Sequence, residues 1–288
     1  MNKEQKPIAE RPAPILANTL LPCSTVSLKR FISFSGGVES TTMCILYGKG
    51  ATAIWCDTGA EHDLMYQRIN EVEKELKLLH CGDFELLRIK GKQNAKGVET
   101  ESLEEYIQLY KMMPSGQKRF CTKYFKIRPI DDFLGQQGEC ELMIGFNADE
   151  EGRTGNLELK ANVNYTYPLL DAGLSRDDCE EVLKLHGLHP NFPVYMLRGG
   201  CRMCFYKSEK EYRAMYHLNK NEFDKMIAFE EGMQDKRLKF YSIMGNGKSL
   251  RQLAVECESE KAFLQLSDFT ELYKSLKKET SCGAFCHR

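Results

Sequence analysis

The first stretch whose residue types could do chemistry is Ser35-Gly36-Gly37, which lies between an apolar run and an amphipathic helical pattern. Two consecutive glycines allow positive φ angles and let a ligand approach the backbone without meeting a Cβ atom. The unpaired amides at the start of the next helix, predicted over Val38–Tyr47, point at the same spot. With the hydroxyls of Ser35, Ser40 and Thr41, the pattern favours a phosphate-binding loop over a simple serine-capped turn.

A second polar group, Asp57-Thr58-Gly59, follows another apolar run, residues 51–56. Ligands of open parallel sheets lie at the carboxyl ends of the strands, so both loops are expected in one crevice. There Asp57 can orient a ribose or Mg²⁺, or it can simply cap a turn. The following Glu61 and His62 are interpreted as a first-turn acid of a helix and a satisfied surface histidine.

The third group is Cys201-Arg-Met-Cys204, a CxxC in a glycine-rich stretch, whose spacing lets two thiolates grip one metal or cluster. A redox dithiol is the alternative. The chain has 12 cysteines and no secretion signal, which favours ligands or reactive thiols in a reducing cytoplasm over disulfides. Cys44 and Cys56 lie inside apolar periodic segments and are expected to be small buried hydrophobes.

The elements that must position these groups alternate between strand and helix patterns. Strands are predicted over residues 29–34, 51–56 and 84–89, with helices between them, which indicates a parallel α/β sheet. Further helices are predicted over 61–79, 103–113, 122–134, 179–188, 208–231 and 268–276, and a buried strand over 141–145. Three regions follow: a mobile arm at 1–28, a nucleotide-binding α/β domain at 29–170, and a helical region with the cysteine cluster at 171–288.

Composition limits the possible partners. With 288 residues and 42% hydrophobic content the chain can build a real core, and no apolar run approaches the roughly 20 residues that span a bilayer. A cytoplasmic protein without membrane contact is therefore expected. The net charge of −1 gives no global attraction to nucleic acid, so such a partner needs a local basic patch. No oligomeric state is favoured.

The string Ser35-Gly36-Gly37-Val38-Glu39-Ser40-Thr41 is similar to the SGGxxS[ST] pyrophosphate loop of the PP-loop ATPases, especially the phosphoadenylyl-sulfate (PAPS) reductase-like branch. Four further segments resemble that branch in order and spacing between about residues 29 and 206. They are a DTGxEH signature at 57–62, a CTxxxKxxP segment at 120–129, a GxxxDExxR turn at 145–153, and Tyr195 with a GCxxC at 200–204.

The resemblance implies an adenine nucleotide alpha-hydrolase-like fold that binds ATP, or PAPS or adenylyl sulfate (APS), with Mg²⁺. The residues implied to bind the nucleotide are Ser35, Gly36, Gly37, Val38, Glu39, Ser40, Thr41, Asp57, Thr58 and Gly59. Catalytic roles fall to Asp57, to Lys126 and Arg153 as holders of phosphate or sulfate oxygens, and to Cys282 in the tail.

Two metal arrangements are open. Cys121, Cys201 and Cys204 can bind a [4Fe–4S] cluster that Cys282 or Cys286 completes, or Cys201, Cys204, Cys282 and Cys286 can form a tetrahedral Zn²⁺ site. Relatives with such clusters often carry a Cys-Cys pair where this chain has Phe120-Cys121, which weakens the cluster interpretation.

The resemblance favours an enzyme that adenylates an acceptor with release of pyrophosphate, for sulfur transfer to nucleic acid or a small molecule. Its partners would be an adenine nucleotide, a nucleic-acid acceptor and a sulfur donor protein. A sulfonucleotide reductase that uses the tail cysteine is the first alternative, because residues 278–283 resemble the ECG tail of those enzymes. A non-catalytic nucleotide-sensing module is the second.

Overall fold

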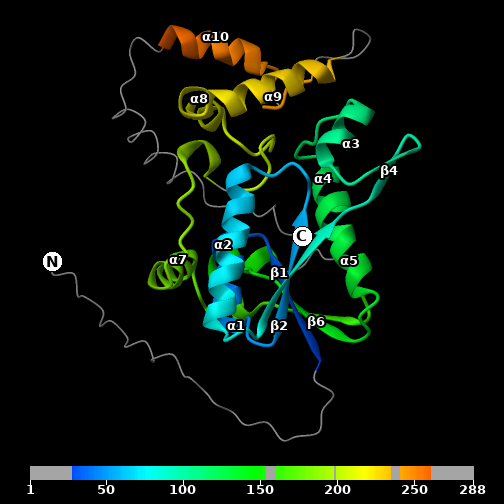
Figure 1. The fold of residues 1–288 in the computed structure, drawn as a ribbon, viewed down its shortest axis with the longest axis vertical. Helices are drawn as coiled ribbons and strands as arrows, with labels where there is room; N and C mark the ends of the chain where they lie inside the picture. Colours follow the sequence, from blue (N-terminus) through cyan, green and yellow to red (C-terminus); the bar gives the residue numbers. More distant parts are fainter. Residues whose placement is uncertain (1–27, 154–159, 198, 235–240, 245, 261–288) are drawn as a thin grey trace, which may run out of the picture.

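The computed structural model describes residues 28–153, 160–197, 199–234, 241–244 and 246–260. Its centre is a five-stranded, all-parallel sheet in the order β3-β2-β1-β6-β7 (Figure 1). The strands are β1 (Lys29–Phe34), β2 (Ala51–Asp57), β3 (Phe84–Lys90), β6 (Cys140–Met143) and β7 (Val163–Thr166). The predicted parallel α/β sheet is therefore confirmed. The strand order changes direction between β1 and β6, which makes their carboxyl ends the expected ligand crevice.

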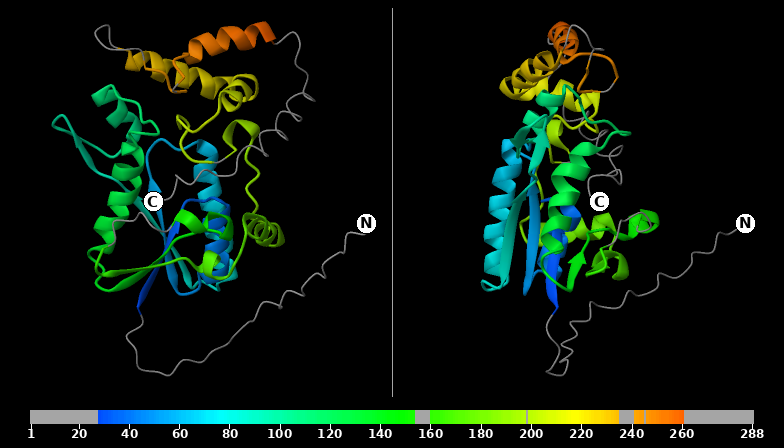
Figure 2. Two further views of the ribbon diagram at one scale, coloured as in Figure 1. Left: turned by 180° about the vertical axis from the view of Figure 1, so that it is seen from behind. Right: turned by 90° about the vertical axis from the view of Figure 1, so that its right-hand side faces the viewer.

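Helices cover both faces of the sheet (Figure 2). The alternation of side chains along each strand separates two cores. Ile32 and Phe34 of β1 belong to the core shared with α1 (Val38–Tyr47) and α2 (Asp63–Leu79). Phe31 belongs to the core on the opposite face, shared with α5 (Arg128–Leu134). The helical pattern after each strand is thus what carries the chain back over the sheet.

The first half of the domain follows the predicted boundaries closely. β1 and α1 have the predicted bounds, and β2 and β3 each extend one residue further. This extension places Asp57 as the last residue of β2, at the carboxyl edge of the sheet. The helix predicted from residue 61 begins at Asp63, because residues 57–62 form a turn before it.

The segment between β3 and β6 differs from the prediction. A short antiparallel hairpin, β4 (Gln93–Ala95) with β5 (Val98–Thr100), was not foreseen. Next, α3 (Leu103–Tyr110) ends before residue 113, because Lys111 takes a left-handed conformation with φ 50°. The predicted helix at 122–134 is present as α4 (Phe120–Thr122), a π-helical turn η1 (Lys123–Ile127) and α5. Single π turns often occur at functional sites.

After β6 the described chain is mainly helical. The elements are η2 (Ala148–Arg153), α6 (Pro168–Asp171), α7 (Arg176–Leu185), η3 (Val194–Met196), α8 (Glu209–Leu218), α9 (Lys220–Met233) and α10 (Leu250–Glu260). The helix predicted over 208–231 is two helices, since the side chain of Asn219 accepts the amide of Glu222 and caps α9.

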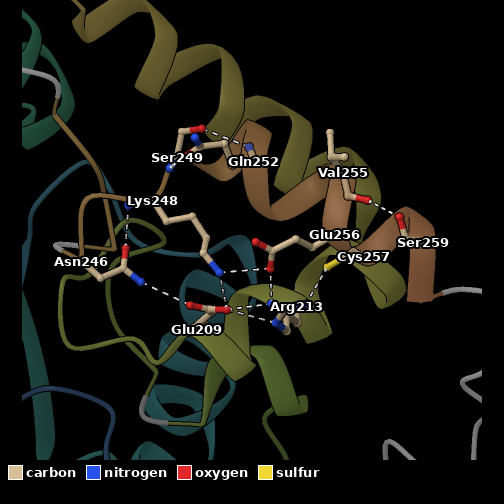
Figure 3. Close-up of polar contacts among 10 residues, drawn as sticks. All are labelled: Glu209, Arg213, Asn246, Lys248, Ser249, Gln252, Val255, Glu256, Cys257 and Ser259. Carbon is tan, nitrogen blue, oxygen red and sulfur yellow. Dashed lines mark hydrogen bonds and ion pairs between the residues drawn. The ribbon is translucent and has the colours of Figure 1, made fainter.

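Glu209, Arg213, Lys248 and Glu256 form a polar cluster, the α8–α10 ion cluster, between α8 and α10 (Figure 3). Lys248 Nζ donates to Glu209 at 3.1 Å and to Glu256 at 3.0 Å. The cluster fastens the last described helix to the helical layer.

The boundary predicted at residue 170 stays a prediction. The predicted arm at 1–28, apart from Leu28, and the predicted helix at 268–276 lie outside the described residues. Within the described part of the chain, no helix combines the length and the apolarity needed to cross a bilayer.

Candidate functional site

The 35–41 loop is fixed by short contacts among its own residues. Ser40 Oγ accepts the amide of Ser35 at 3.2 Å and lies 3.0 Å from Ser35 Oγ, which in turn accepts the amide of Gly37 at 3.3 Å. Gly36 has φ +75°, and a Cβ atom there would lie 2.7 Å from Cδ1 of Ile69. Gly37 has φ −77°, which other residues adopt as well. Only Gly36 therefore uses the positive φ that the glycine pair predicted.

The first turn of α1 presents free donors. The amide of Thr41 bonds to the Gly37 carbonyl at 3.1 Å, and the three amides before it have no intrahelical acceptor by helix geometry. The buried Oγ1 of Thr41 has no hydrogen-bond partner. These donors lie at the positive end of the helix dipole, beside the point where the strand order reverses. The arrangement fits a phosphate group.

Gly145, Asn147 and Arg176 contact the same turn from outside the loop. Glu39 is buried, and its Oε1 accepts from Asn147 Nδ2 at 3.2 Å and from Arg176 Nη1 at 2.6 Å. A Cβ atom on Gly145 would lie 3.3 Å from the backbone of Glu39 and Ser40. The start of the 145–153 turn thus packs directly on α1, and Glu39 holds the loop to its surroundings.

Asp57 closes the turn after β2. Its Oδ1 accepts the amide of Gly59 at 2.8 Å and the hydroxyl of Tyr66 at 2.7 Å, while Lys90 Nζ lies 3.9 Å from Oδ2. The turn-capping interpretation is therefore confirmed, and Oδ2 is the oxygen left for a ligand. Burial and the hydrogen bond to Asp57 raise the pKa of Tyr66, so this tyrosine stays a donor.

The cysteine loop, which we define as residues 199–204, pairs with the residues after β2. The His62 amide bonds to the Gly200 carbonyl at 3.2 Å, and the Arg202 amide to the Ala60 carbonyl at 3.0 Å. The DTGxEH and GCxxC segments, which are far apart in the sequence, therefore form one unit of structure.

Side chains join the two segments as well. Thr58 Oγ1 donates to Glu61 Oε1 at 2.9 Å, and Cys201 Sγ donates to the same oxygen at 3.5 Å. Glu61 is 2% exposed, and its Oε2 is buried without a hydrogen-bond partner. Burial, then the charge of Glu61, raises the pKa of the Cys201 thiol well above its usual range. Cys201 is consequently a protonated thiol in this structure.

His62 and Lys207 form a buried pair beneath the cysteine loop. Lys207 Nζ donates to His62 Nε2 at 2.9 Å and to the Tyr195 carbonyl at 2.9 Å. His62 Nδ1 lies 3.8 Å from Glu222, which also accepts from Arg202 at 3.3 Å. Burial, then the charges of Lys207 and Arg202, lowers the pKa of His62 to about 2. The histidine is therefore neutral and accepts from the lysine.

Sequence reasoning misjudged part of this network. It placed His62 at the surface and Glu61 in the first turn of a helix, whereas both are buried and both precede α2. It did not single out Lys207 or Glu222. The only local signal near Lys207 is the capping box of Ser208 and Glu211, which fixes where α8 begins but says nothing about a partner 145 positions away.

Lys126 connects the π turn to this unit. Its carbonyl accepts from Cys56 Sγ at 3.3 Å, and its charge lowers the pKa of the Cys56, Cys121 and Cys201 thiols, which burial raises more strongly. The backbone of the predicted Lys126 thus lies beside the end of β2, and its charge reaches the thiol of Cys201. Arg153 ends η2, and its side chain lies outside the described part of the chain.

The described thiols do not complete a metal site. Among the described residues, no three side chains of His, Cys, Asp or Glu come together as a group that can hold a metal. Cys121, Cys201 and Cys204 alone therefore do not fit a [4Fe–4S] cluster or Zn²⁺. Cys282 and Cys286 lie outside the described residues.

Comparison with known proteins bears on the sheet domain. Residues 29–166 match the family model of the phosphoadenosine phosphosulfate reductase domain. Residues 29–166 therefore form a domain of the PAPS reductase-like PP-loop type. A further relative is the "Uncharacterized nin region protein ORF290" of Escherichia phage lambda, 27% identical over 201 residues, covering 62% of this chain and 67% of that protein.

A solved structure also resembles this PAPS reductase-like chain. It is the crystal structure of phosphoadenylyl-sulfate (PAPS) reductase from Candida auris in a phosphate complex. The two share 15% identity with a TM-score of 0.40, over 56% of this chain and 75% of that one.

The region that matches the PAPS reductase-like family contains the phosphate loop, Asp57, Cys121 and Lys126. Cys201, Cys204 and Lys207 lie beyond it, in a segment that the hydrogen bonds of residues 60–62 hold against the family domain. The candidate site therefore combines a family element with a segment that the family model does not include.

Proposed function

We propose that this PAPS reductase-like protein binds ATP at the 35–41 loop and transfers the adenylyl group to an oxygen of an acceptor, releasing pyrophosphate. One observation carries the proposal: the free amides of the first turn of α1 and the hydroxyls of Ser35 and Ser40 converge where the strand order reverses. The match to a PP-loop family domain supports a nucleotide as the ligand.

In the proposed step the acceptor oxygen attacks the α-phosphorus of ATP, and the bond from that phosphorus to the bridging oxygen of the β-phosphate breaks. The amides of the loop and the ammonium of Lys126 would stabilise the charge that develops on the leaving pyrophosphate, with Arg153 as a further holder. Asp57 would orient the ribose, or Mg²⁺ when it is bound, through Oδ2. Mg²⁺ would supply charge neutralisation of the phosphates.

The adenylated acceptor would then be attacked by the terminal sulfur of a persulfide on a sulfur donor protein. A carbon–sulfur bond forms as the carbon–oxygen bond breaks, and AMP leaves. A second thiolate of the donor protein then attacks the inner sulfur, so that the sulfur–sulfur bond to the acceptor breaks, the donor becomes a disulfide and the acceptor keeps the sulfur as a thiolate. Nucleic acid and small molecules both contain carbonyl oxygens that suit this exchange. We place the reaction in the cytoplasm, where thiols stay reduced.

The matched family model favours one other activity, sulfonucleotide reduction. In that case the Cys282 thiolate attacks the sulfate sulfur of PAPS or APS, a sulfur–sulfur bond forms, and the adenosine nucleotide leaves. A thioredoxin-type dithiol then supplies two electrons, becomes a disulfide and releases sulfite.

Labelled ATP tests the proposal. Label from α-labelled ATP should appear in AMP and label from γ-labelled ATP in pyrophosphate, only when acceptor is present. Formation of ADP and orthophosphate would contradict adenylation. Sulfite formed from PAPS or APS with thioredoxin, and lost in Cys282→Ser, would identify the reductase. Nucleotide binding without any of these products would indicate a nucleotide-sensing module.

Metal ligation by Cys201 and Cys204, completed either by Cys121 with Cys282 or Cys286, or by Cys282 and Cys286 together, is a separate part of the proposal. Thiolate ligation requires Cys201 to lose the proton that it now donates to Glu61. Protein purified without oxygen should contain iron and sulfide, or zinc. Loss of metal in Cys121→Ser would identify the cluster, and its retention the zinc site. If the protein contains no iron, sulfide or zinc, a redox dithiol is the better account of Cys201 and Cys204.

A further inference from the structure

One segment of this chain is enriched in basic residues. Residues 90–128 contain nine lysines and arginines and four glutamates, a net charge of +5 in a chain whose net charge is −1. The segment comprises the β4–β5 hairpin, α3, α4 and the π turn, which lie together along one side of the sheet (Figure 1). A local basic face of this kind is what a nucleic-acid partner would need on a chain without net positive charge.

The four acids of this segment are already committed to other groups. Glu99 and Glu101 lie 3.6 Å and 3.4 Å from Lys92 Nζ. Glu104 accepts from Arg202 at 2.8 Å, and Glu105 accepts from the hydroxyl of Thr100. These carboxylates therefore do not neutralise the remaining cations of the segment.

Three of those cations are well placed for an anionic partner. Lys96, Lys123 and Arg128 are exposed, and none forms an ion pair with a carboxylate of the described residues. Their charges are consequently available to phosphate groups.

Aromatic rings connect two of these cations in what we call the tyrosine–cation row: Lys96, Tyr110, Tyr106, Tyr124 and Arg128. Lys96 Nζ lies 5.6 Å from the ring centroid of Tyr110, and the centroids of Tyr110 and Tyr106 are 4.7 Å apart. Tyr124 follows at 6.0 Å from Tyr106, and the guanidinium of Arg128 lies 4.4 Å from the Tyr124 centroid. Tyr110 and Tyr124 are half-buried, whereas Tyr106 anchors them in the core.

We infer that the tyrosine–cation row binds single-stranded nucleic acid. Unpaired bases stack on aromatic rings and on guanidinium planes, while lysines and arginines contact the phosphates between them. An acidic protein surface could pair with the lysines and arginines of the row, but it has no bases to stack on the tyrosine rings. A duplex keeps its bases stacked on one another and cannot use them either.

The position of the row agrees with this assignment. Gln93 Nε2 donates to the Tyr124 carbonyl at 3.0 Å, which fixes the hairpin against the π turn. The same π turn contains Lys126, which lies near Cys201. A strand bound along the row would pass beside the candidate site. The inference thereby names the acceptor class of the proposed function and rests on it to that extent, although the binding itself does not need ATP.

The test is fluorescence anisotropy of the full chain with a fluorescein-labelled 20-nucleotide single strand of mixed sequence, as DNA and as RNA, without ATP. Charge reversal of Lys96, Lys123 and Arg128 to glutamate should lower the affinity at least about tenfold. It should also reduce the slope of log K against log salt by about 2, at about 0.7 for each phosphate that is no longer neutralised. The matched control reverses three exposed lysines elsewhere, Lys49, Lys74 and Lys184, and should change neither.

Stacking is tested separately. Tyr110→Ala should weaken binding about tenfold, and Tyr110→Phe should restore it, because the ring and not the hydroxyl carries the interaction with the base. Thermal unfolding checks that each variant is folded.

Three results would overturn the inference: equal losses of affinity in the row and control triple variants, polyglutamate competing as well as the oligonucleotide, or a duplex of the same sequence binding as tightly as the single strand. If the protein binds the single strand but releases no pyrophosphate from ATP, the proposed function is contradicted and the inference stands. If it releases pyrophosphate but does not bind the single strand, only the inference is contradicted.

Discussion

The phosphate loop and the cysteine loop both lie at the carboxyl edge of the sheet, but they are held in different ways. The side-chain contacts of Ser35 with Ser40 join residues five positions apart. In the cysteine loop, Cys201 contacts Glu61 across 140 positions, and Lys207 beneath it contacts His62 across 145. The serine contacts of the phosphate loop are therefore local, whereas its Glu39 contacts the distant residues Asn147 and Arg176. The cysteine loop depends on long-range contacts.

The difference also concerns what each loop offers to a ligand. The first turn of α1 leaves backbone donors without acceptors, so an anion can bind without breaking a hydrogen bond. The thiol of Cys201 already donates to Glu61, so a metal or a sulfur atom would have to displace that hydrogen bond. Binding at the phosphate loop should therefore be less sensitive to the surrounding fold than chemistry at the cysteine loop.

The largest effect on stability is expected beneath the cysteine loop. Lys207→Met leaves His62 Nε2 and the Tyr195 carbonyl buried without their donor, which should lower the free energy of unfolding by about 2 kcal/mol. Urea denaturation measures it, with exposed Lys184→Met as the control that should change little. An unchanged midpoint for Lys207→Met would show that this pair does not hold the loop.

Acid should act on the same network through His62. The unfolded chain takes up a proton near the ordinary pKa of 6.5, whereas the folded chain does so only near its lowered pKa of about 2. The free energy of unfolding should thus fall as pH drops below 6.5, by up to about 1.4 kcal/mol per pH unit from this group. In His62→Gln the fall between pH 6.5 and 4.5 should be shallower than in exposed His186→Gln. Parallel curves would contradict a neutral buried His62.

The smallest effect is expected at the α8–α10 ion cluster, which is formed by partly exposed side chains (Figure 3). Lys248→Ala removes ion pairs with Glu209 and Glu256 that water and salt screen. Its Tm should be slightly below that of the native chain at low salt and equal to it in 1 M salt. A large drop that persists in high salt would show that this cluster is more than a surface interaction.

The features that could be predicted from the sequence are those that depend on residues close together in the chain. The bounds of β1 and α1 follow from an apolar run, two glycines and a helical period, and the capping role of Asp57 follows from its place after a strand. The split between α8 and α9 could have been predicted, because Asn219 is a good helix cap followed three positions later by Glu222.

Other features depend on tertiary contacts that no local pattern encodes. The burial of Glu61 and His62 follows from the return of the cysteine loop across the end of β2, and Lys207 becomes a partner of His62 only there. The three-residue strands of the β4–β5 hairpin are too short to show a period. These are long-range pairings, and one sequence contains no signal for them.

The central claim, that the 35–41 loop binds the phosphates of a nucleotide, is tested most directly by calorimetric titration of ATP into Gly36→Ala and Gly37→Ala. Alanine at 36 must adopt φ +75° and places Cβ 2.7 Å from Ile69, whereas at 37 the backbone is ordinary and Cβ lies 3.3 Å from Ser35 Oγ. The account predicts at least about a tenfold loss of affinity for Gly36→Ala and a clearly smaller loss for Gly37→Ala, with both variants folded. Unchanged ATP affinity in folded Gly36→Ala would contradict it.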